Sequence, residues 1–223
     1  MSGDPTTPAD QVDEGPDDEL DDELDGAVAP LVRELPTRLT GAAYVVLGGA
    51  GLYAALALAI DKVKLLEDPT FVPGCNLNPV LSCGSVMETD QASVFGFPNP
   101  FLGLIGFGAV VAYGLLVVTG ARVTNAARWG MAVGTVAGAV MVHWLAYQSM
   151  FVIGALCPWC LLVWTVTLPL TLWSVLIAAR TVPALASAAE LLWDARFLLL
   201  FLWYLGFIVT ALVQFWSYWQ TLL

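Results

Sequence analysis

The chain has 223 residues, of which 58% are hydrophobic and 12% are charged, and its mean hydropathy is +0.77. This composition excludes an ordinary soluble domain and indicates an integral membrane protein. The net charge of −11 arises in the first 25 residues, which hold eleven acidic side chains and no basic one, while the remainder carries eight of each sign. No part of the chain is basic enough to bind nucleic acid.

The N-terminal segment, residues 1–35, is rich in Asp, Glu and Pro and lacks aromatic residues. Such a segment buries too little apolar surface to offset its ordering entropy, so we predict a disordered acidic tail on the cytoplasmic side. It is not a signal peptide, because it has neither a basic start nor an early apolar run. The membrane domain is therefore predicted to comprise residues 36–223.

Five apolar stretches follow the tail, and none of them contains Lys, Arg, Asp or Glu. They cover about residues 41–60, 101–119, 129–153, 157–179 and 197–216. Each approaches the ~20 residues that a helix needs to cross a ~30 Å hydrocarbon core. Because backbone groups in lipid must be satisfied within the segment, we predict five transmembrane helices and an all-α integral membrane protein.

The Lys and Arg residues predict the orientation. Six of the eight precede the first span or lie between spans two and three or four and five: Arg33, Arg38, Arg122, Arg128, Arg180 and Arg196. Five crossings put these three regions on one side, which the positive-inside rule makes cytoplasmic. The loop 61–100, the turn near 154–157 and the C-terminus are then extracytoplasmic.

The loop between the first two spans carries Cys75 and Cys83 and mixes apolar residues with turn formers. Pro73-Gly74 and Asn78-Pro79 are turn signals. Residues 82–93 are compatible with a short interfacial helix. We expect this loop to cover the outer mouth of the helix bundle.

The second cysteine pair, Cys157 and Cys160, opens the fourth span as Cys-Pro-Trp-Cys. A helix start lowers a thiol's pKa, and Pro158 suits the first helical position, which needs no N–H donor. Cys160 lies one turn deeper, closer to lipid. Two such pairs on the outer face suggest an electron relay from water to a molecule dissolved in the membrane, through thiol–disulfide exchange.

Other interpretations of these residues remain open. The cysteines are also compatible with two inert structural disulfides, or with a zinc site, although zinc sites favour tighter paired spacing. His143, inside the third span, either has a functional role or forms a hydrogen bond that supports helix packing. Trp159 and Trp164, near the second pair, are candidate walls of a cofactor site.

In these features the chain resembles the bacterial vitamin K epoxide reductase (VKOR) homologues, and among them the actinobacterial type. The resemblance covers about residues 40–180. It rests on the order of three motifs: a loop cysteine pair followed by a hydroxyl residue, a Pro-rich lead into the second span, and a Cys-x-x-Cys at the start of the fourth.

The resemblance implies a four-helix bundle around a quinone, with the fifth helix outside it. It implies that Cys75 and Cys83 are the shuttle pair, which takes electrons from a reduced partner. Cys83 would form a mixed disulfide with Cys157, and Cys160 would lie against the quinone ring. No zinc or other metal enters this scheme.

The resemblance also implies quinone contacts. Thr89 matches the Ser/Thr of the family six residues after the second loop cysteine. Asn99 matches the Asn that hydrogen-bonds a quinone carbonyl. Where the vertebrate enzymes have Tyr, this chain has Trp164, whose indole N–H can also donate.

The implied function is that of a thiol:quinone oxidoreductase in the bacterial plasma membrane, with menaquinone as acceptor. It would reoxidise a disulfide-forming protein outside the cytoplasm. Many bacterial homologues carry a thioredoxin-like domain after the fifth helix, whereas this sequence ends about seven residues after its last span. We therefore expect the donor to be a separate DsbA-like thioredoxin-fold protein. The alternatives are quinone or epoxide reduction in a vitamin K cycle, and a non-catalytic protein with structural disulfides.

Overall fold

The computed structural model describes residues 38–220, and the predicted acidic tail lies outside these residues. Five helices in this part are long and apolar enough to cross a membrane, which confirms the predicted all-α membrane fold. They are α2 (Arg38–Glu67), α4 (Pro100–Val118), α5 (Asn125–Gln148, continued by the π-helical η2, Ser149–Ile153), α6 (Pro158–Ala179) and α8 (Arg196–Gln214).

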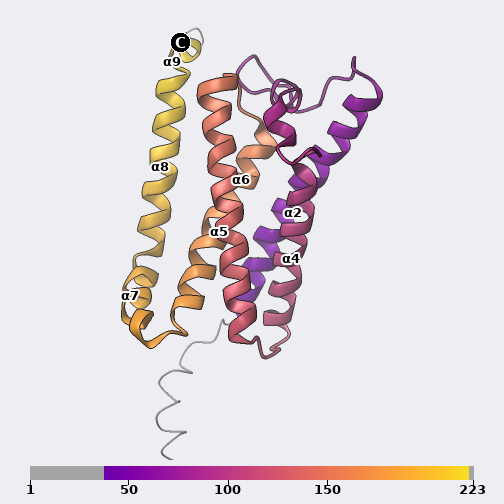
Figure 1. Ribbon diagram of the computed structural model, residues 1–223. Helices are drawn as coiled ribbons and strands as arrows, with labels where there is room; N and C mark the ends of the chain where they lie inside the picture. Colours follow the sequence, from indigo (N-terminus) through magenta and orange to yellow (C-terminus); the bar gives the residue numbers. More distant parts are fainter. Residues whose placement is uncertain (1–37, 221–223) are drawn as a thin grey trace, which may run out of the picture. The chain divides into compact units, whose positions relative to one another are not determined.

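Four of these helices, α2, α4, α5 and α6, form a bundle (Figure 1). α2 and α4 approach closely because glycines face each other: a Cβ added to Gly114 would lie 2.9 Å from Val45 N. Small residues allow this approach between membrane helices. The Tyr44 hydroxyl lies 2.8 Å from Ser174 Oγ, which links α2 to α6 through a buried hydrogen bond.

The pairs α2–α4 and α5–α6 are in extensive contact, whereas α4 and α5 touch each other little. Thr171 Oγ1 on α6 donates to the carbonyl of Thr135 on α5 at 3.0 Å, which adds to the second pair. The bundle therefore consists of two tightly packed helix pairs, and the space between α4 and α5 is not filled by helix packing.

Two predicted spans are longer in the structure. α2 continues past the apolar stretch to Glu67. Within this extension, Lys62 Nζ donates to the carbonyl of Met87 at 2.6 Å. A helix has no reason to end where its apolar run ends, because its backbone bonds are independent of side-chain polarity. α5 begins at Asn125, four residues before the predicted span, because Thr124 caps its first turn by accepting from Ala127 N.

The loop that follows α2 contains two short helices inside the predicted interfacial segment, α3 (Cys83–Met87) and η1 (Asp90–Ser93). A further helix, α7 (Pro183–Asp194), was not predicted and fills the connection between α6 and α8. It begins with Pro183 at its first position, a residue suited to a helix start.

The two ends of the bundle differ. The loop with α3, the start of α6 and the short C-terminal helix α9 (Trp216–Trp219) lie at one end, and α7 lies at the other (Figure 1). α8 runs beside the bundle, and most of its apolar side chains are exposed. All four cysteines lie at the end that carries the loop.

Candidate functional site

A short backbone bridge brings the two cysteine pairs together. Ser82 N donates to the carbonyl of Leu156 at 2.9 Å, and Leu156 N donates to the carbonyl of Val80 at 2.7 Å. These bonds form an isolated parallel bridge between Leu81 and Leu156. Because Cys83 and Cys157 each follow the bridged segments directly, the bridge fixes them side by side.

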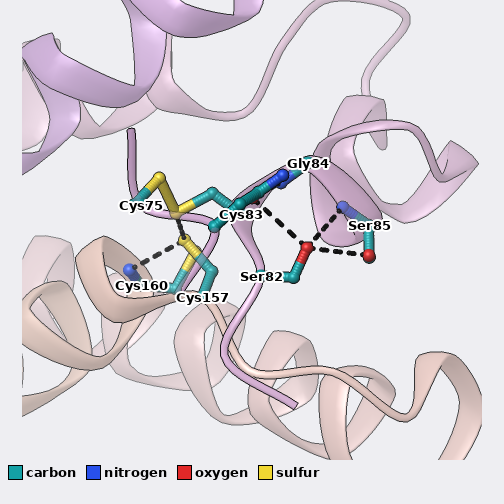
Figure 2. Close-up of a disulfide and its surroundings, with 8 residues drawn as sticks. Cys75, Ser82, Cys83, Gly84, Ser85, Cys157 and Cys160 are labelled. Atoms are coloured by element: carbon teal, nitrogen blue, oxygen red, sulfur yellow. Dashed lines mark hydrogen bonds between the residues drawn. A yellow bond between two sulfur atoms is a disulfide. The ribbon is translucent and has the colours of Figure 1, made fainter. Parts of the chain in front are cut away.

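Polar side chains hold the loop cysteine in place. Ser82 is the N-cap of α3, and its Oγ accepts from Ser85 N at 3.2 Å (Figure 2). The Oδ1 of Asn76 accepts from Gly84 N at 2.8 Å and from the Ser82 hydroxyl at 3.3 Å. Both sides of Cys83 are therefore anchored to groups that belong to the loop itself.

The sulfur atoms form a continuous line from the loop to α6. Cys75 and Cys83 are joined in a disulfide, and Cys157 and Cys160 are free thiols. Cys157 Sγ donates to Cys83 Sγ at 3.2 Å, and both residues are almost completely buried (Figure 2). This arrangement places a thiol in position to attack a disulfide sulfur.

The ionisation of Cys157 is favoured by its place at the helix start. This residue is the N-cap of α6, just before the spanning segment, and its Sγ accepts from Cys160 N at 3.4 Å. A hydrogen bond from the Cys160 thiol lowers the pKa of Cys157 below its ordinary value, and backbone N–H groups act in the same direction. Burial and the charge of Asp61 oppose this effect without cancelling it.

An apolar cavity of about 570 Å³ lies against the second cysteine pair. It is lined by both cysteines of that pair, by the loop at one end and by the glycines near the start of α5 at the other. Its volume is in the usual range for small-molecule sites, ~300–1,000 Å³. The cavity therefore occupies the space that α4 and α5 leave between them.

The lining fits the expected quinone, an apolar ring with two carbonyl acceptors. Trp164 lines the cavity and is 5% exposed, and its indole Nε1 is buried without a hydrogen-bond partner among the described residues. A buried indole N–H normally has an acceptor. A carbonyl of a bound ligand would supply one.

Asn99 also lines the cavity, at the start of α4. Its Nδ2 donates to the carbonyl of Gln91 at 2.7 Å, and its Oδ1 accepts from Val94 N at 3.1 Å. The amide thus ties the loop to α4, and one of its two N–H groups is left for a ligand. Its role as a direct quinone donor stays a prediction.

Three of the predicted quinone contacts do not line the cavity. Thr89 Oγ1 donates to the carbonyl of Val86. Trp159 lines a second, more open hollow of about 460 Å³ that also borders Cys75 and Asp61. His143 has both ring nitrogens bonded, Nδ1 to the Ala139 carbonyl at 2.6 Å and Nε2 to Trp203 Nε1 at 3.0 Å.

Several site residues were not found from the sequence. Asn76, which holds the backbone around Cys83, carries no motif that marks it. Phe207 on α8 lines the cavity although its helix reads as a uniformly apolar span. The glycines of α5 that line the cavity, Gly130, Gly134 and Gly138, recur every fourth residue, and this spacing was a usable signal.

The alternative of a zinc site can be compared with the arrangement of the potential ligands. Across residues 38–220, no group of three or more His, Cys, Asp or Glu side chains is arranged to hold a metal ion. One pair of cysteines is joined, and the other borders the cavity.

Comparison with protein families identifies the chain's family. A model of the vitamin K epoxide reductase family matches residues 42–175, which is more than half of the chain and includes all four cysteines. The match ends before α7 and α8. No individual curated protein matches the chain significantly. The chain therefore belongs to the vitamin K epoxide reductase family, whose members are membrane oxidoreductases that act on thiols and quinones.

Proposed function

We propose that this protein is a thiol:quinone oxidoreductase of the actinobacterial type, in a bacterial plasma membrane, which reoxidises a separate DsbA-like protein outside the cytoplasm. The observation that carries the proposal is the contact of 3.2 Å between Cys83 Sγ and Cys157 Sγ, next to a cavity that Cys160 lines. A thiol pair that contacts a disulfide on one side and borders an apolar cavity on the other is suited to pass electrons between them.

The first exchange takes place at the loop disulfide. A thiolate of the reduced partner attacks Cys75 and releases the Cys83 thiolate. The partner's second thiol then attacks the mixed disulfide, so the partner leaves oxidised and both loop cysteines are reduced. The open hollow beside Cys75 gives a partner's sulfur a route to this atom.

The second exchange moves the electrons to α6. Cys83 attacks Cys157 of an oxidised Cys157–Cys160 pair and releases the Cys160 thiolate. Cys75 then attacks Cys83, which restores the loop disulfide and leaves both α6 cysteines as thiols. The state described by the structure, with a loop disulfide and two free α6 thiols, is the product of this step.

The α6 thiols face the acceptor. A quinone, when bound, accepts two electrons and two protons and leaves as the hydroquinone, while Cys157 and Cys160 become a disulfide. Trp164 and Asn99 are the residues with N–H groups to hold its carbonyls. Val86, Met87 and Phe95 of the loop side enclose the same space and exclude water from the reacting sulfurs.

The length of the cavity supports an acceptor with a long isoprenoid tail, such as the proposed menaquinone. Its lining continues along α5 from Ser149 to Gly130, which is about 28 Å of helix at ~1.5 Å per residue. A Cβ added to Gly130, Gly134 or Gly138 would meet nothing within 4 Å, so this face of α5 is open. A long isoprenoid tail has room along such a face, whereas a ring alone needs only the end near Cys160.

The basic residues support the proposed orientation. Arg122, Arg128, Arg180 and Arg196 lie in or beside the connections at the end of the bundle opposite the cysteines (Figure 1). The positive-inside rule assigns that end to the cytoplasm. The cysteine pairs would then face the oxidising side, where disulfide formation is required.

A reconstituted assay tests the proposal. The purified full chain is mixed with a reduced DsbA-like protein and a menaquinone analogue, and quinone absorbance and partner thiols are followed together. We expect one quinone to be reduced for each partner disulfide formed, and no reduction by a Cys157→Ala variant. Folded wild-type protein that oxidises no partner and reduces no quinone would disprove the function. Supplying vitamin K epoxide in place of the quinone tests the vitamin K cycle alternative.

A further inference from the structure

The fifth helix, α8, reaches the cavity although it lies outside the segment that matches the family. Most of its side chains are exposed, as expected for a helix beside the bundle that faces lipid. Phe207 is only partly exposed, and it lines the cavity together with residues of the other helices. One face of α8 is therefore part of the site.

This face of α8 packs around Trp164. The Phe207 ring is stacked on the Trp164 indole, with ring centroids 4.0 Å apart and planes inclined by 30°. Tyr204, one turn earlier on α8, meets the same indole edge-on at 5.5 Å. Trp164 is the cavity residue whose buried N–H has no hydrogen-bond partner among the described residues. Two aromatic side chains of α8 thus fix the orientation of this indole donor in the cavity wall.

Hydrogen bonds attach α8 to the bundle at the same level. Trp203 Nε1 donates to His143 Nε2 of α5 at 3.0 Å, and the Tyr204 hydroxyl donates to the carbonyl of Thr165 on α6 at 2.6 Å. The ring of His143 is held from its other side by the Ala139 carbonyl. Interhelical hydrogen bonds of this kind stabilise the association of membrane helices. Their position beside Trp164 gives α8 a defined rotation there.

We propose that α8 completes the quinone site, with Phe207 as a positioning residue that holds the Trp164 indole for hydrogen bonding to a quinone carbonyl. The Trp203–His143 bond keeps Phe207 in register. This assigns His143 a role in holding α8 and gives it no direct contact with the quinone. The inference rests on the proposed function, since it concerns the same cavity.

The test compares two Phe→Ala substitutions on α8. Phe207→Ala removes the stacked ring, and Phe201→Ala removes a ring of the same size that is 60% exposed and does not line this cavity. We expect Phe207→Ala to raise the KM for a menaquinone analogue about three- to tenfold, the range expected for loss of an aromatic pair. Phe201→Ala should leave it within about twofold.

Two further measurements separate positioning from general damage. The rate at which the loop disulfide oxidises the reduced partner in a single turnover, without quinone, should be unchanged by Phe207→Ala. In a Trp164→Phe background, which keeps a ring but removes the N–H, Phe207→Ala should have little further effect. Phe207→Tyr preserves the stacked ring and should restore the wild-type KM.

Quinone binding is also measured directly, by quenching of tryptophan fluorescence in the full chain. Weaker binding in Phe207→Ala, with no turnover even in wild type, would support the site and count against the proposed function. Equal KM and equal binding in Phe207→Ala and Phe201→Ala, with wild type active, overturn the inference and leave the proposed function standing. If Phe207→Ala does not fold, Phe207→Leu is compared with Phe201→Leu in its place.

Discussion

The contact between Cys83 and Cys157 is the residue-scale feature on which the proposed electron transfer depends. Cys157 attack on Cys83 releases Cys75, so the two disulfides interconvert without any oxidant. In the wild type the Cys160 thiol can attack Cys157 of this mixed disulfide, which forms the Cys157–Cys160 disulfide and releases Cys83 as a thiol. Cys160 therefore controls the populations of these disulfide states. It acts through Cys157, which is the residue that contacts Cys83.

Removing the Cys160 thiol should make the exchanged state visible. We expect a Cys160→Ala variant to accumulate a Cys83–Cys157 disulfide, because the resolving thiol is absent and the two sulfurs already lie 3.2 Å apart. Peptide mapping under non-reducing conditions after acid quenching measures it. A Cys157→Ala/Cys160→Ala variant is the matched control. Retention of the Cys75–Cys83 disulfide alone in Cys160→Ala would contradict the relay.

The pH dependence of Cys157 follows from the hydrogen bond that it receives. Because the Cys160 thiol lowers the pKa of Cys157, its thiolate forms at a lower pH than that of an ordinary cysteine. The thiolate is the attacking species, so the exchange rate should rise with pH and reach its plateau at a lower pH than for an ordinary cysteine. In Cys160→Ala the profile should move to higher pH. Thiolate absorbance near 240 nm measures the shift in a Cys75→Ala/Cys83→Ala background, where Cys157 has no loop disulfide to attack, with Cys157→Ser as the blank. An unshifted profile would exclude the hydrogen bond as the cause.

Residue types and spacing predicted the cysteines but only part of the cavity lining. Cys160 and Trp164 are four residues apart and share a helix face, whereas Trp159 is turned about 140° from Trp164 at ~100° per residue. This rotation places Trp159 in the other hollow, and it was available from the sequence. The side on which His143 lies could be read only from the glycines of the same helix, because His143 is turned about 140° from Gly138 at ~100° per residue, whereas the apolar residues around them show no periodicity.

At the scale of elements, α5 carries the long side of the cavity. Gly130, Gly134 and Gly138 give it a face without side chains, at a cost in helix propensity of up to ~1 kcal/mol each relative to Ala. Glycines that face open space have no packing reason to be small. Room for a ligand is a reason that fits the cavity they line.

A large side chain on this face should weaken binding of the quinone tail without affecting binding of the quinone ring. We expect Gly134→Leu to raise the KM for a long-tailed menaquinone about tenfold, the scale of inserting extra methylenes into a filled site. A quinone without a tail should be reduced as in wild type, because it needs only the end near Cys160. Gly108→Leu is the matched control, since Gly108 also meets open space but does not line the cavity.

An equal loss of activity with both quinones in Gly134→Leu would show that the glycine face does not hold a tail.

The boundaries of the helices were predicted less accurately than their existence. Apolar runs located all five spans, but α7 was missed because its 12 residues are too few to form a span, and α2 extends seven residues beyond its apolar run. Hydropathy reports where the lipid is, and hydrogen bonding decides where the helix ends.

For the whole molecule, the two ends of the bundle have opposite chemical characters. One end holds four cysteines and the loop, and the other holds most of the arginines. In the proposed orientation, this distribution separates the redox chemistry from the reducing cytoplasm. The same distribution was readable from the sequence, because it requires only the spans and the basic residues between them.

Labelling of introduced cysteines tests this orientation. In a chain whose four native cysteines are replaced by alanine, Val94→Cys probes the loop and Ser187→Cys probes α7, and both positions are exposed. A membrane-impermeant thiol reagent should label Val94→Cys in intact cells and Ser187→Cys only after permeabilisation. The reverse pattern would place the loop in the cytoplasm, where no DsbA-like partner could reach Cys75. The proposed partner would then be excluded, while quinone reduction at the cavity would remain possible with a cytoplasmic thiol donor.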